Sequence, residues 1–184
     1  MLRRNYNEKE YKVRNMKEYK YYMDVLLHAE FSTEKCQFCG ATENCLEGVY
    51  FDNPKISSIC LRCFEEKKGN VYIPGYLRNK IKNSVNEKVA ELEYTPPVPW
   101  IQYNDWQICC DDFCQFIGEW TREDFINVAG KENSIDFFKS MLCMETYSLI
   151  DYINELWESL GESTAAFVFQ CVKCNKKIVV CQSY

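Results

Sequence analysis

The sequence has a single histidine, His28, among its 184 residues. One histidine leaves little basis for a Ser-His-Asp constellation or for a catalytic zinc site built on imidazoles. The seven glycines form no phosphate-cradling loop. No apolar run approaches the roughly 18 residues that cross a bilayer, and residues 1–20 lack the apolar stretch of a signal peptide. We therefore expect a cytoplasmic protein without a membrane span and without enzymatic activity.

The sequence is rich in hydrophobic residues and in cysteine. Hydrophobic residues make up 47% and charged residues 27% of the chain, which favours a packed globular fold over disorder. There are 12 cysteines. In a reducing compartment, cysteines at this density indicate metal binding before disulfides.

Charge is unevenly distributed along the chain. Residues 101–166 carry 13 acidic and 3 basic side chains, whereas residues 1–20 carry 7 basic and 3 acidic ones. The acidic stretch disfavours binding to a phosphate backbone and favours a cationic partner. The solvated faces of amphipathic helices are the simpler interpretation of the same pattern.

The clearest motif is a double pair of cysteines, Cys36-Gln-Phe-Cys39 and Cys60-Leu-Arg-Cys63. Two intervening residues let both thiolates of a pair point inward from one tight turn. Gly40 permits the positive φ at which backbone N–H groups donate to sulfur. Two such pairs at this separation predict a structural zinc site with Cys36, Cys39, Cys60 and Cys63 as ligands.

A third pair, Cys171-Val-Lys-Cys174, needs partners from elsewhere in the chain. The nearest dense source is the segment 109–114. Cys110 and Cys114, with three residues between them, face one side if the segment forms a helical turn or loop. We predict a second zinc site from Cys110, Cys114, Cys171 and Cys174, with Cys109 as the alternative to one of these ligands.

Three cysteines and the histidine are left outside these sets. Cys45, Cys143 and Cys181 are interpreted as core or surface thiols. His28 lies eight residues before Cys36 and is an alternative ligand, although a packed or surface histidine is the preferred interpretation.

The expected fold class is α+β, with zinc-knuckle β-hairpins on the N-terminal side and at the C-terminus and a helical segment between them. Thr121 to Asp124 forms a capping signal for a helix that Gly130 ends, and Ser134 begins a longer helix that Gly161 ends. The apolar runs 165–169 and 178–180 predict a hairpin around the third cysteine pair.

Prolines in Thr95-Pro-Pro-Val-Pro99 indicate a linker and suggest a division of the chain. We predict a polar arm at 1–18, an N-terminal zinc-knuckle module at 19–94, the linker at 95–99, and a segment at 100–184 with one shared core. The last segment combines the helices with the C-terminal zinc-knuckle hairpin.

An ordered set of motifs resembles the CbrC family, small cysteine-rich bacterial proteins named for colicin tolerance. The resemblance covers residue 19 to the C-terminus and rests on Lys20-Tyr21-Tyr22, Cys36-x-x-Cys39-Gly40, Gly48-Val-Tyr50, Cys60-x-x-Cys63, Thr95-Pro96, Trp100, Trp106, Cys110-x-Asp112, Phe116-x-Gly118 and Phe169-x-Cys171-x-x-Cys174. The family has Cys-Pro-Trp-Cys where this chain has Cys60-Leu-Arg-Cys63, and glycine where it has Asn175. The resemblance implies a bacterial, cytoplasmic protein with a role in tolerance or immunity to protein toxins.

Three functions are compatible with these features. The first is a zinc-stabilised, non-enzymatic protein that binds a protein partner, such as a bacterial toxin domain, through its acidic surface. The second is a nucleic-acid-binding zinc ribbon that uses residues 1–20 and the lysines around the third cysteine pair. The third is a thiol redox or zinc-hydrolytic enzyme, which the absence of an open coordination position disfavours.

Overall fold

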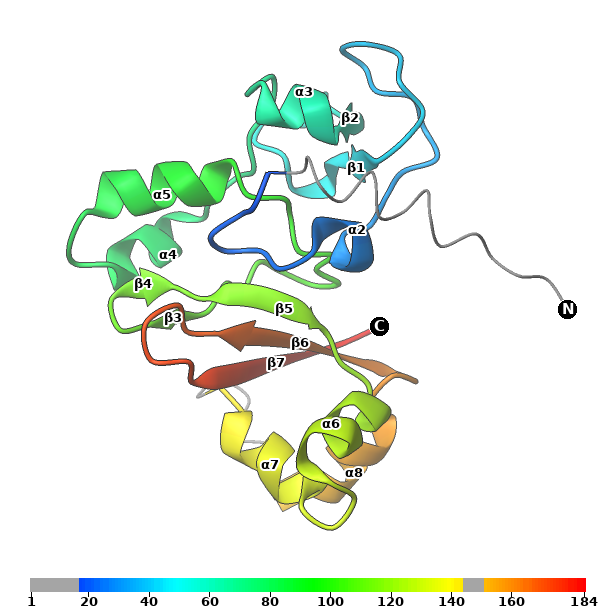
Figure 1. The fold of residues 1–184 in the computed structure, drawn as a ribbon, viewed down its shortest axis with the longest axis vertical. Coiled ribbons are helices and arrows are strands. Elements are labelled where there is room, and N and C mark those ends of the chain that lie inside the picture. The colour runs from blue at the N-terminus through cyan, green and yellow to red at the C-terminus, as the bar shows by residue number, and fades with distance from the viewer. Residues whose placement is uncertain (1–16, 144–150) are drawn as a thin grey trace, which may run out of the picture.

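The computed structural model describes residues 17–143 and 151–184, which form short helices and small antiparallel sheets (Figure 1). The elements before the prolines are α2 (Val25–His28), β1 (Cys45–Glu47), the 3-10 helix η1 (Gly48–Tyr50), β2 (Ser58–Cys60), α3 (Leu61–Glu65), α4 (Gly75–Lys80) and α5 (Val85–Glu93). Those after them are β3 (Ile108–Cys109), β4 (Asp112–Phe113), β5 (Gln115–Glu119), α6 (Arg122–Ala129), α7 (Ser134–Met141), α8 (Ile153–Ser159), β6 (Thr164–Gln170) and β7 (Lys177–Ser183). The predicted α+β class, with cysteine-rich hairpins on both sides, is confirmed.

A three-stranded antiparallel sheet of order β5-β6-β7 lies at the centre of the molecule. β6 and β7 form the predicted C-terminal hairpin, in a register that pairs Phe167 with Val180 and Phe169 with Ile178. Side chains alternate between the two faces of a strand. Phe167 and Phe169 of β6 therefore belong to one core cluster, and Ala166 and Val168 to another.

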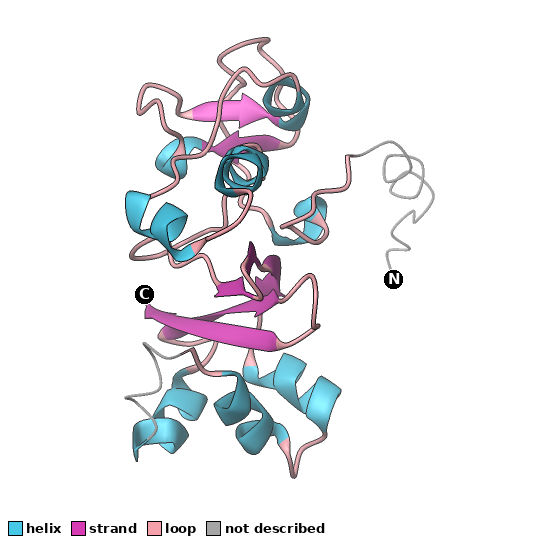
Figure 2. Cartoon of the chain, turned by 90° about the vertical axis from the view of Figure 1, so that its left-hand side faces the viewer, coloured by secondary structure: helices cyan, strands magenta, loops and turns pink. Residues whose placement is uncertain are grey.

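Helices α6, α7 and α8 cover one face of this sheet, while the N-terminal elements lie on its other side (Figure 2). Under the helices, the rings of Phe125, Phe138 and Trp157 meet at centroid distances of 5.1–5.9 Å. On the opposite face, Trp100 stacks on Phe169 at 5.8 Å. Apolar burial on both faces makes the sheet the shared wall of two cores.

The capping signal before α6 has the predicted role. The Asp124 carboxylate accepts hydrogen bonds from the backbone N–H and the hydroxyl of Thr121, at 2.7 and 2.8 Å. At the other end, Gly130 has φ +79° and its N–H donates to the Ile126 carbonyl. These contacts satisfy groups that a helix end leaves without intrahelical partners.

The single long helix predicted from Ser134 to Gly161 is wrong. Helix α7 ends at Met141, and α8 begins only at Ile153. Between them, Leu142 forms a β-bridge with Val179, and the Cys143 N–H donates to the Val179 carbonyl at 3.0 Å. Pairing with the edge of the sheet therefore replaces the next helical turn; residues 144–150 of the predicted helix lie outside the described residues.

The segment around the predicted linker packs into the larger core, where Val98 is fully buried and Trp100 is 6% exposed. The cluster contains buried residues from both sides of 95–99, such as Leu92 and Phe116. The proposed domain boundaries stay a prediction. Among the described residues, none of the helices has the length and apolarity needed to traverse a bilayer.

Candidate metal centres

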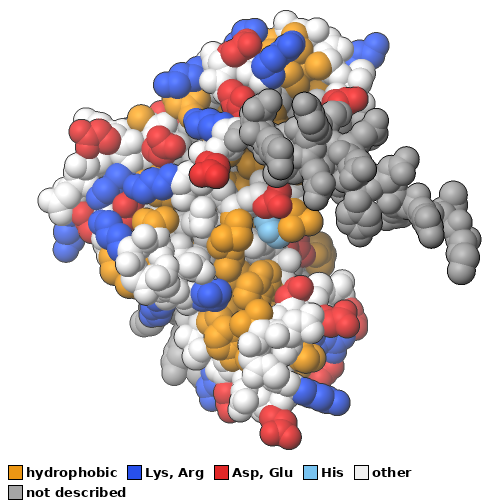
Figure 3. Space-filling model, in the orientation of Figure 1, with side chains coloured by type: hydrophobic (Ala, Val, Ile, Leu, Met, Phe, Trp, Pro, Cys, Tyr) orange, Lys and Arg blue, Asp and Glu red, His pale blue; other side chains and the backbone are white. Residues whose placement is uncertain are grey.

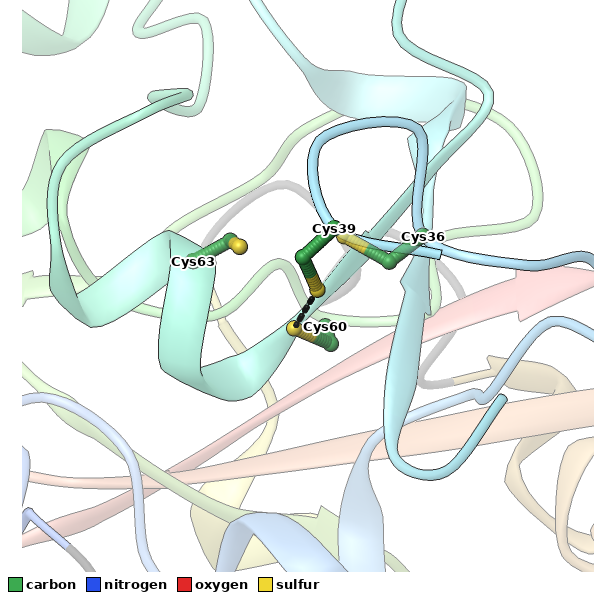
Figure 4. A group of neighbouring side chains, drawn as sticks. All are labelled: Cys36, Cys39, Cys60 and Cys63. Carbon is green, nitrogen blue, oxygen red and sulfur yellow. Dashed lines mark hydrogen bonds between the residues drawn. The ribbon is translucent and has the colours of Figure 1, made fainter. Parts of the chain in front are cut away.

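The first cysteine group lies between the turn before β1 and the β2–α3 junction. Cys36 and Cys39 come from the turn, Cys60 ends β2, and Cys63 lies in the first turn of α3. Gly40, at φ +73°, donates its N–H to the Cys36 carbonyl at 2.8 Å and closes the turn. The four sulfurs lie within 4.8 Å of one another, and Figure 4 shows them gathered between the turn and the helix.

The spacing of these sulfurs fits one tetrahedral metal ion. A zinc–sulfur bond of about 2.3 Å places tetrahedral sulfurs about 3.8 Å apart. The Cys39 and Cys60 sulfurs are 3.5 Å apart, and the remaining separations stay below 4.8 Å. A disulfide requires about 2.05 Å, so the group is four free thiols arranged as a ligand set.

The pKa shifts differ among the thiols of the first group, and two cations lie beside its sulfurs. The pKa of Cys39 is lowered to about 6, first by the N–H of Ala41, whereas burial raises the pKa of Cys63 to about 12. The Lys68 ammonium lies 3.7 Å from the Cys63 sulfur, and contact with Cys39 raises the pKa of Arg62. Four thiolates around a divalent ion carry a net charge of −2, which these two cations partly offset.

The second group joins two hairpin turns that are distant in sequence. Cys109 ends β3, Cys110 begins the β3–β4 turn, and Cys171 and Cys174 come from the β6–β7 turn. The Cys109 sulfur lies 3.8 Å from the sulfurs of both Cys110 and Cys174, and all four sulfurs lie within 4.8 Å of one another. The same tetrahedral spacing argument applies, so the chain has two four-cysteine groups that can hold metal ions.

The β6–β7 turn has the hydrogen bonding of a zinc knuckle. The N–H groups of Lys173 and Cys174 donate to the Cys171 sulfur, each at 3.5 Å. Burial by itself raises the pKa of Cys171, but these donors bring it down to about 7. Asn175, at φ +60°, takes the left-handed conformation that Gly40 has in the first group.

The structure places Cys109, rather than Cys114, with Cys110, Cys171 and Cys174. Cys114 is fully buried, and burial raises the pKa of its thiol. Its carbonyl accepts a hydrogen bond from the Trp106 indole at 2.8 Å. The predicted pairing with Cys110 assumed a helical turn or loop, whereas the segment is a hairpin with a two-residue turn at Cys110 and Asp111.

Two neighbouring aspartates hold the second group against the rest of the protein. The Asp111 carboxylate accepts hydrogen bonds from the N–H groups of Lys82 and Asn83, at 2.6 and 3.1 Å. The buried Asp112 carboxylate accepts the Tyr21 hydroxyl at 2.8 Å and the Lys20 ammonium at 3.0 Å. Both carboxylates are therefore engaged in support of the β3–β4 turn.

His28 belongs to neither cysteine group. Its ring packs edge-on against Phe116 and over Gly118, where a Cβ would come within 2.6 Å of the imidazole. Burial lowers the pKa of His28 below its ordinary value. Figure 3 shows this single histidine on a face where hydrophobic side chains gather beside it. Cys45, Cys143 and Cys181 also lie outside the two groups.

Comparison with known proteins gives one match. Residues 16–182 match the uncharacterised protein family UPF0167. Comparisons with curated proteins and with solved structures gave no match. The match covers both cysteine groups and every described helix and strand apart from Ser183, the last residue of β7, and on this evidence the chain belongs to the UPF0167 family.

Proposed function

We propose that this chain is a zinc-stabilised bacterial protein of the cytoplasm, which binds a protein partner, without catalysis, in a toxin-tolerance or immunity-like role. The observation that carries the proposal is the pair of closed four-cysteine groups. The resemblance to the CbrC family adds the tolerance role.

Zinc is the metal that best suits these groups. Soft thiolates select zinc, copper(I) and iron–sulfur clusters, and tetrahedral four-sulfur sets are typical of structural zinc. Zinc would stabilise the fold by tying its turns together. The first group would tie the turn at Cys36 and Cys39 to the β2–α3 junction. The second would connect Cys109 and Cys110 to Cys171 and Cys174, about sixty residues later.

A binding role agrees with the composition of the ligand sets. A catalytic zinc keeps one coordination position for water, normally beside histidine or carboxylate ligands. Here each ion would have four thiolates, with Asp111 and Asp112 already engaged in hydrogen bonds. His28 packs against Phe116 and Gly118, away from both sets.

A cationic partner agrees with the acidic surface that remains after internal pairing. Two glutamates, Glu158 and Glu162, pair with Arg122. Glu123 and Glu155 remain exposed on the helical layer. Such charges would steer a basic toxin domain toward the protein, with a dependence on salt.

The proposal is tested on purified full-length chain in two steps. Elemental analysis, without added metal or chelator, should give two zinc ions per chain. Titration with basic nuclease-toxin domains should then detect a complex that weakens with salt. One zinc or none, or no complex across the panel, would contradict the proposal.

Two further assays address the other candidate functions. Salt-dependent binding to duplex DNA or single-stranded RNA would favour the nucleic-acid alternative. Activity of the zinc-replete chain on disulfide or ester substrates would favour the enzymatic one.

A further inference from the structure

Three hollows adjoin one another along residues 28–34, beside the junction of the first cysteine module and the sheet. Their volumes are about 540, 50 and 390 Å³. Glu47 lines both the first and the second hollow, and Glu30 and Trp100 line both the second and the third. Because they share lining residues, the three hollows are neighbours along one stretch of surface, which we name the 28–34 groove.

One wall of the groove is the chain segment 28–34 itself, which the first and third hollows follow in turn. The segment is bent rather than strand-like, because His28 ends α2 and the chain bends at residue 29 and again at 33–34. Phe31 forms a β-bridge with Leu46, which fixes the middle of the segment. The groove therefore follows a bent path and can accept a short peptide segment.

The lining of the groove has charge of one sign. Its acidic members are Glu30, Glu34, Glu47 and Glu119, all of which are exposed, and among the described residues no lysine or arginine lines any of the three hollows. His28 lines the third hollow. Burial lowers the pKa of His28, which disfavours its charged form. Glutamates spaced along a groove focus a negative potential into it.

Trp100 gives the groove a rigid floor, and Tyr50 and Tyr184 give it accessible aromatic rings. Trp100 is 6% exposed and is held by its stacking on Phe169, whereas Tyr50 is half-buried and Tyr184 is 65% exposed. The Tyr50 hydroxyl donates to the Trp100 carbonyl, and Tyr184 donates to the Glu119 carboxylate at 2.6 Å. A guanidinium stacks on aromatic faces while it pairs with carboxylates, so these side chains suit arginine in particular.

We propose that the 28–34 groove binds a short, arginine- or lysine-rich segment of the partner protein. The proposal rests on the protein-binding function above and names the part of the partner that is recognised. The glutamates bind its basic side chains, and the rigid aromatic wall limits the ordering that binding requires.

The direct test uses a fluorescent probe, an octapeptide of alternating alanine and arginine, with an alanine–glutamate octapeptide as its counterpart. Anisotropy on the full-length chain should show binding of the basic peptide alone. The double variant Glu30→Gln/Glu47→Gln should weaken binding about fivefold to tenfold. The matched double variant Glu87→Gln/Glu91→Gln, with the same charge change on exposed positions of α5, should change it less than twofold.

Equal weakening by both variants, or no binding of the basic peptide, would overturn the proposal that this groove binds a basic segment. A third variant neutralises Arg3, Arg4 and Arg14 in the chain's own basic N-terminal segment. Binding by this variant alone would also overturn the proposal, because it would assign the groove to that segment of the same chain.

The same variants separate this proposal from the proposed function. A toxin domain that binds the Glu30→Gln/Glu47→Gln variant as tightly as the parent would refute the groove while leaving the binding function intact. A chain that binds the basic peptide but no toxin domain would contradict the function and support the groove.

Discussion

The sharpest prediction concerns which cysteine completes the second metal centre. Replacement of Cys109 by alanine should remove one zinc per chain, whereas replacement of Cys114 by alanine should leave both. The Cys109 sulfur lies 3.8 Å from those of Cys110 and Cys174. Cys114 is buried next to this group but is not a member of it.

The expected magnitudes follow from the two environments. A structural zinc ion contributes about 10–16 kcal/mol of binding free energy, so one of four equivalent thiolates accounts for about 3 kcal/mol, on the order of 100-fold in affinity. The Cys114 side chain is 0% exposed and contributes packing only. Its truncation should lower the free energy of unfolding by about 1 kcal/mol.

The assay is elemental analysis after equilibration with a chelator whose zinc affinity lies between those of the intact and the damaged site. The parent and the Cys114→Ala variant should retain two ions and Cys109→Ala should retain one. The group at Cys36, Cys39, Cys60 and Cys63 serves as the internal reference. Retention of two ions by Cys109→Ala together with loss of one by Cys114→Ala would refute the assignment.

Three further predictions test individual contacts that stabilise the fold. Asp112→Asn should lower the free energy of unfolding by about 1–3 kcal/mol, as measured by urea denaturation. Although burial raises the pKa of Asp112, Tyr21 and Lys20 hold it below its ordinary value, so its contribution is present above about pH 4 and disappears as pH falls through the native pKa. The difference from the parent should thus be constant between pH 7 and 5, and a difference that shrinks in this range would contradict the ion pair. Gly118→Ala should cost about 3 kcal/mol, because φ is +131° and the new Cβ meets His28; His28→Ala in the same chain should recover part of that loss, and no recovery would disprove the contact. Thr121→Ala should cost about 1 kcal/mol with no change in zinc content, since its hydroxyl bonds Asp124 at the start of α6, at the opposite end of β5 from the second cysteine group.

Local chemistry made the first cysteine group and the C-terminal hairpin predictable. The spacing from Cys36 to Cys39 is sufficient for a knuckle, and Gly40 at φ +73° supplies the conformation that the turn needs. The apolar runs around Cys171 and Cys174 likewise specify a hairpin, because its two strands lie close in sequence.

The choice of Cys109 depends on a contact distant in sequence. Cys110 and Asp111 have φ +53° and +57°, and Lys82 and Asn83 bind the Asp111 carboxylate. An aspartate in a two-residue turn tolerates the left-handed region and was the available signal for a hairpin at this point. The sequence alone does not show that this aspartate is bound by the α4–α5 connection, which fixes the turn.

The end of α7 was unpredictable for a related reason. The residues after Met141 have a pattern that helix and strand can share, and propensity alone favours continuation of the helix. The competing partner is Val179 of β7, which is close in space but distant in sequence. Tertiary pairing thus decided the boundary.

The helical layer leaves the sheet and returns to it at neighbouring points. β5 ends at Glu119, which pairs with Phe167 of β6, and the Trp120 N–H donates to the Ala166 carbonyl. Residues 120–163 are therefore topologically an insertion into a β-hairpin, and the second cysteine group lies at the other end of that hairpin. The ligand turns and the helical layer therefore lie at opposite ends of the same strand pair, so the outer surface of the layer can change without altering the residues that form the cysteine group.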